Sequence, residues 1–192
     1  MATIPKARCG VAYTISGNSP KVVYLQEGTP TWTSHLGGGA RGTPSTGYFK
    51  EGALLTLNST QGLDVVMFGG DSAGSTDPGT GFDQSRKRIV GFAMEDGTGT
   101  TANTVAIAAA NSDTVFYGNT ASSVSTATAT ISIIDIGETQ GASMNGSRFY
   151  VNVNASVGGS LLRIIAKHDA DAYGDVNGRC LFQFVPASRL WE

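Results

Sequence analysis

The stretch Arg88-Ile-Val-Gly-Phe-Ala-Met-Glu-Asp96 is the part of the sequence that decides the fold. Two more short runs follow it, Val105-Ala-Ile-Ala108 and Asp113-Thr-Val-Phe116, and Gly, Thr, Asn and Asp lie between them. Short runs of β-branched and small apolar residues between turn residues are typical of consecutive β-strands. Similar runs occur at 10–16, 21–25, 48–57, 63–68, 148–153, 161–166 and 179–185. We therefore predict an all-β fold, a compact β-barrel or β-sandwich.

The domain organisation follows from where hydrophobic residues begin. Residues 1–20 contain few of them, so we expect an extended N-terminal arm, with one possible strand at 10–16, ahead of a single β-rich domain over 21–192. Near the other end, the turn-rich segment 169–178 separates two strongly apolar runs and would allow them to pair as a hairpin.

Long Gly-, Ser- and Thr-rich loops are predicted between several strands. Residues 28–47 and 69–81 hold many glycines together with prolines, which interrupt regular structure. Residues 118–130 are almost all small, and we expect either an exposed loop or an extended segment lying on another subunit. The spacing in Ile131–Ile136 fits a strand or a short helical turn and does not choose between them.

The charge content points to a protein that is packed against neighbours. Charged residues make up 15% of the chain, against about 25% in typical soluble domains. The formal net charge of −2 does not favour nucleic acid as a partner, and Arg86-Lys87-Arg88 fits a solvated cluster or a salt bridge to another subunit. The longest apolar run, Val105–Ala110, is far too short for a membrane span, and the N-terminus lacks the apolar core of a signal peptide. We expect synthesis in a cytoplasm and no membrane partner.

No catalytic, metal or cofactor site is predicted. In the segment His168–Gly178 the oxygen ligands of a calcium loop are conceivable, but their spacing does not match an EF-hand, and we favour turn formation as the role of its Asp residues and of Asn177-Gly178. Glu95 and Asp96 are adjacent in a strand and should point to opposite faces. Gly37-Gly-Gly39 lacks the helix start and lysine of a phosphate loop.

The cysteines and histidines also fall short of a site. Cys9 and Cys180 could form a disulfide or remain two separate thiols, and one pair of cysteines does not decide this. His35 and His168 are too few for a zinc site.

Four large apolar residues are our candidates for interface anchors. Trp is enriched where protein interfaces are strongest, and three of the candidates lie close to the C-terminus. The alternative for each is ordinary packing inside its own domain. The candidates are Trp32, Phe184, Leu190 and Trp191.

The order of the short motifs resembles that of the decoration, or cement, proteins on capsids of tailed bacteriophages. The resemblance covers mainly the C-terminal two-thirds. It rests on Pro5, Lys21–Gly28, Lys50–Leu57, Ile89–Asp96, Val105–Ala108, Asp113–Phe116, Asp175–Arg179 and Phe184–Pro186. The chain departs from that pattern by its Gly-rich insertion at 28–47 and its small-residue stretch at 118–130.

The resemblance implies a virion protein without enzymatic activity. Its partners would be the major capsid protein, on the outer surface of the capsid lattice, and neighbouring copies of itself in a homo-oligomer, which we expect to be a trimer, with a dimer as the alternative. Such a protein holds the head together against internal DNA pressure. A carbohydrate- or receptor-binding β module of a fibre or adhesin is the competing hypothesis, for which only Tyr173 with Asp171 and Asp175 offers a sugar site. A hydrolase has no positive support.

Overall fold

The computed structural model describes residues 9–26, 51–57, 65–67, 89–97, 103–121, 129–145, 148–153 and 161–192. These residues form strands and two 3-10 turns, which confirms the all-β prediction. The strands are β1 Gly10–Thr14, β2 Val22–Gln26, β3 Leu54–Leu57, β4 Val65–Met67, β5 Ile89–Ala93, β6 Thr104–Ala109, β7 Thr114–Ala121, β8 Thr139–Asn145, β9 Arg148–Asn152, β10 Leu162–Lys167 and β11 Arg179–Phe184. The turns are η2 Ile133–Asp135 and η3 Pro186–Ser188.

One of the two sheets closes into a barrel. Its strand order is β1-β7-β11-β10-β8-β9, and β9 also pairs in parallel with the last residues of β7. That last pairing joins the two ends of the run from β7 to β9, so no open edge remains in the ring. Strand β1 pairs antiparallel with the first half of β7, from Gly10 opposite Tyr117 to Thr14 opposite Thr114.

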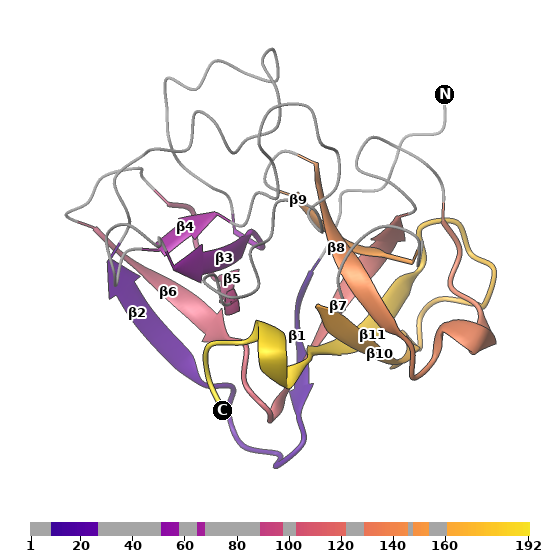
Figure 1. Ribbon diagram of the computed structural model, residues 1–192, viewed down its shortest axis with the longest axis horizontal. Helices are drawn as coiled ribbons and strands as arrows, with labels where there is room; N and C mark the ends of the chain where they lie inside the picture. The colour runs from indigo at the N-terminus through magenta and orange to yellow at the C-terminus, as the bar shows by residue number, and fades with distance from the viewer. Residues whose placement is uncertain are drawn as a thin grey trace.

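The second sheet lies beside the barrel, as Figure 1 shows with the sheet on the left and the barrel on the right. Its order is β2-β6-β5-β3-β4, and all of its pairings are antiparallel. Strand β5 is buried along its whole length because both faces of this sheet are covered there. One face packs on the barrel and contributes to the main core cluster. The other face carries a separate apolar cluster, which we call the outer cluster and which consists of Ala53, Leu55, Val90, Ala93, Val105 and Ile107.

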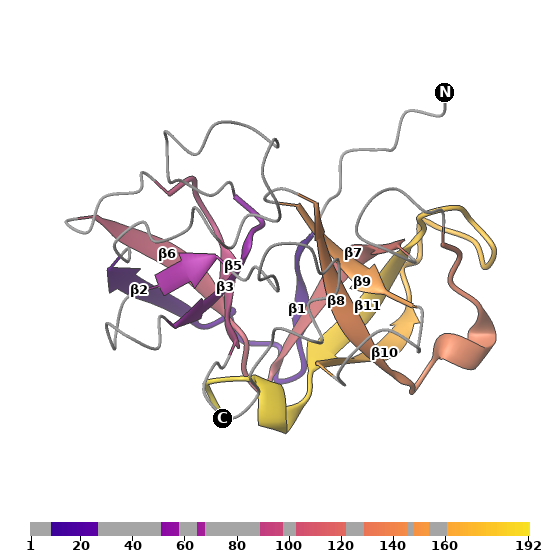
Figure 2. The same ribbon diagram turned by 45° about the horizontal axis from the view of Figure 1, so that its top comes forward.

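Two connections between barrel and sheet, from β1 to β2 and from β6 to β7, lie side by side. Strands β1 and β2 pair with β7 and β6 in turn, so two bent ribbons run together from one layer to the other (Figure 2). Asp113 holds the corner of this ribbon pair. Its carboxylate accepts hydrogen bonds from the backbone N–H and the hydroxyl of Ser16, at 2.7 and 2.6 Å, and its carbonyl accepts one from Ile15 N at 2.8 Å.

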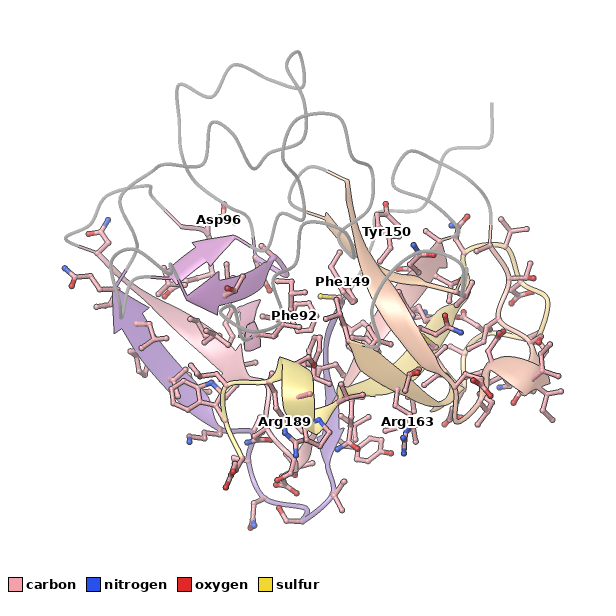
Figure 3. The ribbon with its side chains drawn as sticks, in the orientation of Figure 1. Phe92, Asp96, Phe149, Tyr150, Arg163 and Arg189 are labelled. Atoms are coloured by element: carbon pink, nitrogen blue, oxygen red, sulfur yellow. The ribbon has the colours of Figure 1, made fainter. Side chains whose placement is uncertain are left out.

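Five phenylalanines form the centre of the core. Phe92 comes from the sheet, and its ring centroid lies 5.0 Å from Phe149, 5.1 Å from Phe116, 5.8 Å from Phe184 and 6.2 Å from Phe182, which all come from the barrel. Most of these pairs meet edge to face, the arrangement that the ring quadrupoles favour. Figure 3 shows Phe92 and Phe149 together between the two layers.

The predicted N-terminal arm is wrong for its second half. Residues 10–14 form β1, which is hydrogen-bonded to β7, and the partly buried Cys9 and Val11 pack against the main core cluster. The strand expected at 10–16 is therefore confirmed as β1. It belongs to the β-rich domain, which thus begins earlier in the sequence than the predicted residue 21. Residues 1–8 lie outside the described residues, as do the predicted loops at 28–47 and 69–81.

Two further expectations need correction or completion. Residues 118–121, expected in a loop or on another subunit, are buried and continue β7 into the barrel wall. Segment 131–136, left open between strand and helical turn, contains the 3-10 turn η2. The hairpin expected across 169–178 is confirmed by the antiparallel pairing of β10 with β11.

A bulge at Gly91 aims Phe92 into the barrel. Residues two apart in a regular strand face the same side, yet Val90 belongs to the outer cluster and Phe92 to the barrel core. The pairing of β5 with β3 is irregular at this point, and Gly91 has a φ of +151°. A Cβ on Gly91 would lie 1.9 Å from the carbonyl oxygen of Ala108, so glycine is required.

We predict that Gly91→Ala destabilises the protein by about 3 kcal/mol or more, because the overlap is with backbone and the bulge must move. The control is Gly17→Ala, which has a φ of +76° but nothing within 4 Å of the added Cβ and should cost about 1 kcal/mol. Urea unfolding followed by circular dichroism measures both. Equal losses in the two variants would contradict the role of the bulge.

Candidate interaction surfaces

The predicted anchor Phe184 lies inside the domain. Its exposed fraction is 1%, and its ring contacts Phe92, Phe116 and Phe182 in the core. The packing alternative therefore holds for Phe184, and its use as an interface anchor is wrong. Trp32 lies outside the described residues.

Leu190 and Trp191 pack on the five-stranded sheet of the same molecule. They lie near the end of the segment 185–192, which we call the C-terminal strap. The strap leaves β11 of the barrel and reaches β5, where Leu190 N donates to Ile89 O at 2.8 Å. The indole Nε1 of Trp191 donates to Val90 O at 3.0 Å, and the ammonium of Lys21 lies 4.8 Å from the ring centroid. Both side chains cover the outer cluster and remain half-buried. Their contacts support packing, and a second role at an interface stays a prediction.

The turn between β10 and β11 uses its polar residues to hold itself together. Arg179 donates to both carboxylate oxygens of Asp171 from its side chain, at 2.8 and 2.9 Å, and also from its backbone N–H at 2.7 Å. These contacts lower the pKa of Asp171 to about 2. Asp175 accepts a hydrogen bond from Ala172 N at 2.7 Å, and Asn177 has a φ of +54°. The interpretation of these residues as turn formers is confirmed.

The other polar candidates also serve the backbone. Glu95 accepts a hydrogen bond from Ala106 N at 2.8 Å, and Asp96 accepts one from Glu51 N at 2.9 Å, so one carboxylate holds strand β6 and the other holds the turn before β3. His168 Nδ1 accepts one from Ala170 N at 3.2 Å. In the described ranges, no group of three or more His, Cys, Asp or Glu side chains is placed to hold a metal ion.

The two cysteines are free thiols. Cys9 Sγ donates to Gly52 O at 3.2 Å, while Cys180 is buried in the main core cluster. Desolvation raises the pKa of both thiols well above the usual range, so both are protonated at neutral pH.

Large apolar side chains are exposed at the end of the barrel where β10 turns into β11. We call this the barrel-end surface. It consists of Ile133 (69% exposed), Ile134 (79%), Tyr173 (46%) and Val176 (58%). Sequence reasoning missed it, although the Ser132–Asp135 spacing is a helix-start signature that predicts a turn, and a turn exposes consecutive residues.

Backbone contacts hold the two segments of the barrel-end surface together. Gly174 N donates to Ile131 O at 3.0 Å, Asn177 N donates to Ala129 O at 2.7 Å, and Thr130 forms a β-bridge with Val176. Figures 1 and 2 both show the turn η2 and the β10–β11 connection at the same end of the molecule. The exposed side chains are thus presented on a prearranged backbone.

A second exposed apolar row crosses the five-stranded sheet. Tyr24 of β2 lies opposite Ala106 of β6, and Met94, just after β5, donates from its N–H to the carbonyl of Ala106. Tyr24 is 71% exposed and Met94 48%. We call Val22, Tyr24 and Met94 the sheet-edge row, because β2 is the outermost strand on its side among the described strands.

Comparison with known proteins finds no match to a protein-family model, to a curated protein or to a solved structure. Among the residues that the structure describes, no helix has the length and apolar character needed to cross a membrane.

We predict that the Asp171–Arg179 pair makes stability depend on acid pH. The carboxyl has a pKa of about 2 in the folded protein and about 3.9 when unfolded. Its contribution is therefore complete above pH 4 and is lost as the pH falls through 2. Because the pair is near the surface, Asp171→Asn should cost about 1–2 kcal/mol at neutral pH and flatten the profile in that window. Asp169→Asn is the control, and equal thermal-melt profiles for both variants would contradict the prediction.

We also predict that Trp191 stabilises the isolated protein. Trp191→Ala should lower the free energy of unfolding by about 2 kcal/mol, because the half-buried ring covers the outer cluster. Trp191→Phe keeps most of the packing, loses the bond to Val90 and should cost about 1 kcal/mol. Urea unfolding tests both. If neither variant changes the free energy of unfolding, the packing role of Trp191 is contradicted, and the hypothesis that Trp191 anchors an interface is supported.

Proposed function

We propose that this chain is a capsid decoration protein of a tailed bacteriophage, which binds the outer surface of the major capsid protein lattice and stabilises the head. The observation that carries the proposal is the barrel-end surface. Four large apolar side chains are exposed there on a backbone that the fold has already ordered, and such exposed groups are typical of interaction sites. The motif order that resembles decoration proteins gives the partner class.

The architecture suits a passive stabiliser. The barrel strands from β7 to β9 close into a ring and are joined to the second sheet through an aromatic core, and such a preformed scaffold loses little conformational entropy when it binds. Binding that is restricted to the assembled lattice stabilises that lattice by mass action. Each contact can be weak, since a homo-oligomer that touches several capsid subunits gains by multivalency.

We assign self-association to the sheet-edge row. Strand β2 is outermost on its side among the described strands, and its residues Val22–Leu25 include no proline or charge, so this edge is a favourable template for pairing with another chain. The sheet-edge row extends that edge onto the face of the sheet. This assignment supports a homo-oligomer, while the expected trimer, with a dimer as the alternative, comes from the resemblance to decoration proteins.

The competing sugar-binding function has less support from the geometry. Its carboxylate Asp171 has both oxygens engaged by Arg179, and Asp175 accepts a hydrogen bond from its own turn. Asp171 and part of Asp175 are thus already used to hold the turn, which weakens the case for a sugar site at Tyr173.

We predict that capsids stripped of this protein release DNA at a lower temperature than decorated capsids, and that adding the protein back restores the higher temperature. The protein should co-sediment with expanded capsids and not with unassembled capsid subunits. Equal release temperatures would contradict the stabilising role. Binding on a glycan array without binding to capsids would favour the receptor-binding hypothesis instead.

A further inference from the structure

The net negative charge of the chain lies at the barrel end. Segments 130–138 and 167–179, which carry the barrel-end surface, contain five carboxylates and two basic side chains, a formal net charge of −3, whereas the whole chain has −2. The remaining chain is therefore close to neutral. The carboxylates are Asp135, Glu138, Asp169, Asp171 and Asp175, and the basic residues are Lys167 and Arg179.

Most of this negative charge is available to a partner. Arg179 neutralises Asp171, and the ammonium of Lys167 lies 5.8 Å from the Tyr173 ring centroid. Glu138, Asp169 and Asp175 are exposed, and Asp135 is half-buried. The apolar side chains of the barrel-end surface thus have an acidic border. The low charge content of the whole chain therefore does not describe the barrel end, where the local net charge is negative.

We propose that the barrel-end surface is the face that docks on the capsid, and that its partner is a protein surface with an apolar hollow bordered by lysine or arginine. This inference rests on the proposed function and names the chemistry of its partner. Complementary charge at the border orients the encounter, and the apolar centre supplies the affinity.

The acidic border disfavours the other occupants. Two copies of this face would bring like charges together, so the barrel end does not serve self-association. Nucleic acid and anionic lipid present phosphates, which the same carboxylates repel. A cationic protein surface remains as the complementary partner.

The test is co-sedimentation of the full chain with expanded capsids, with matched variants. Ile134→Asp places a charge at the most exposed apolar position and should weaken binding at least about tenfold. Ile15→Asp is the control, because Ile15 is 64% exposed at the turn between β1 and β2. It should bind as the wild type does. Thermal melts confirm that both variants fold, and Val176→Asp replaces Ile134→Asp if that variant does not.

Charge reversal tests the chemistry of the partner. We expect wild-type binding to weaken as salt rises from about 0.05 to 0.5 M, whereas the double variant Glu138→Lys/Asp169→Lys should bind at least about tenfold more weakly at low salt and lose that salt dependence. The control Glu51→Lys/Glu192→Lys changes the net charge equally, at exposed positions outside the barrel-end segments, and should retain both binding and salt dependence.

The outcomes separate the two proposals. If the wild type does not bind capsids, the proposed function fails and this inference fails with it. If the wild type binds and the Ile134→Asp and charge-reversal variants bind equally well, this inference alone is overturned. Weak binding by Ile134→Asp with normal binding by the charge-reversal variant would overturn the cationic partner.

Discussion

The packing of Phe92 among the phenylalanines of the barrel is the interaction on which the rest of the structure depends. Phe92 is the aromatic side chain that the five-stranded sheet contributes to the barrel core, beside Leu54, Ile89 and Ala108, and its ring centroid lies 5.0–6.2 Å from those of four barrel phenylalanines. The layers are also joined by the β1–β2 and β6–β7 ribbons and by the C-terminal strap. Without the Phe92 ring, the sheet would contribute mainly the smaller side chains of Leu54, Ile89 and Ala108 to the shared core.

This dependence explains why glycine is required at position 91. Phe92 reaches the barrel only because a bulge reverses the facing of β5, and the bulge brings its backbone against the carbonyl of Ala108. Once β5 is placed, Val90 faces outward, and the strap covers it with Leu190 and Trp191. Leu190 and Trp191, which the sequence suggests as interface anchors, thereby cover an apolar cluster of their own domain.

The barrel-end surface consists of large apolar side chains that do not pack into either apolar cluster. Ile133, Ile134, Tyr173 and Val176 lie on a turn and a hairpin connection at the end of the barrel, where their side chains are exposed. The Asp171–Arg179 pair and the backbone bonds to Ile131 and Ala129 fix those segments. Order in the turns and exposure of their apolar side chains together give the barrel end its proposed capacity to bind.

Local patterns in the sequence determined the all-β class, the approximate place of most strands, the β10–β11 hairpin and the turn role of Asp175 and Asn177. These features depend on alternation and turn chemistry within a few residues. Strand β8 escaped prediction because Thr139–Asn145 has small and polar residues that become strand only beside β9 and β10. Whether Phe184 is buried and Ile134 exposed was decided by tertiary structure alone, because burial depends on register and on the closing β7–β9 pair, which bring together residues distant in the chain.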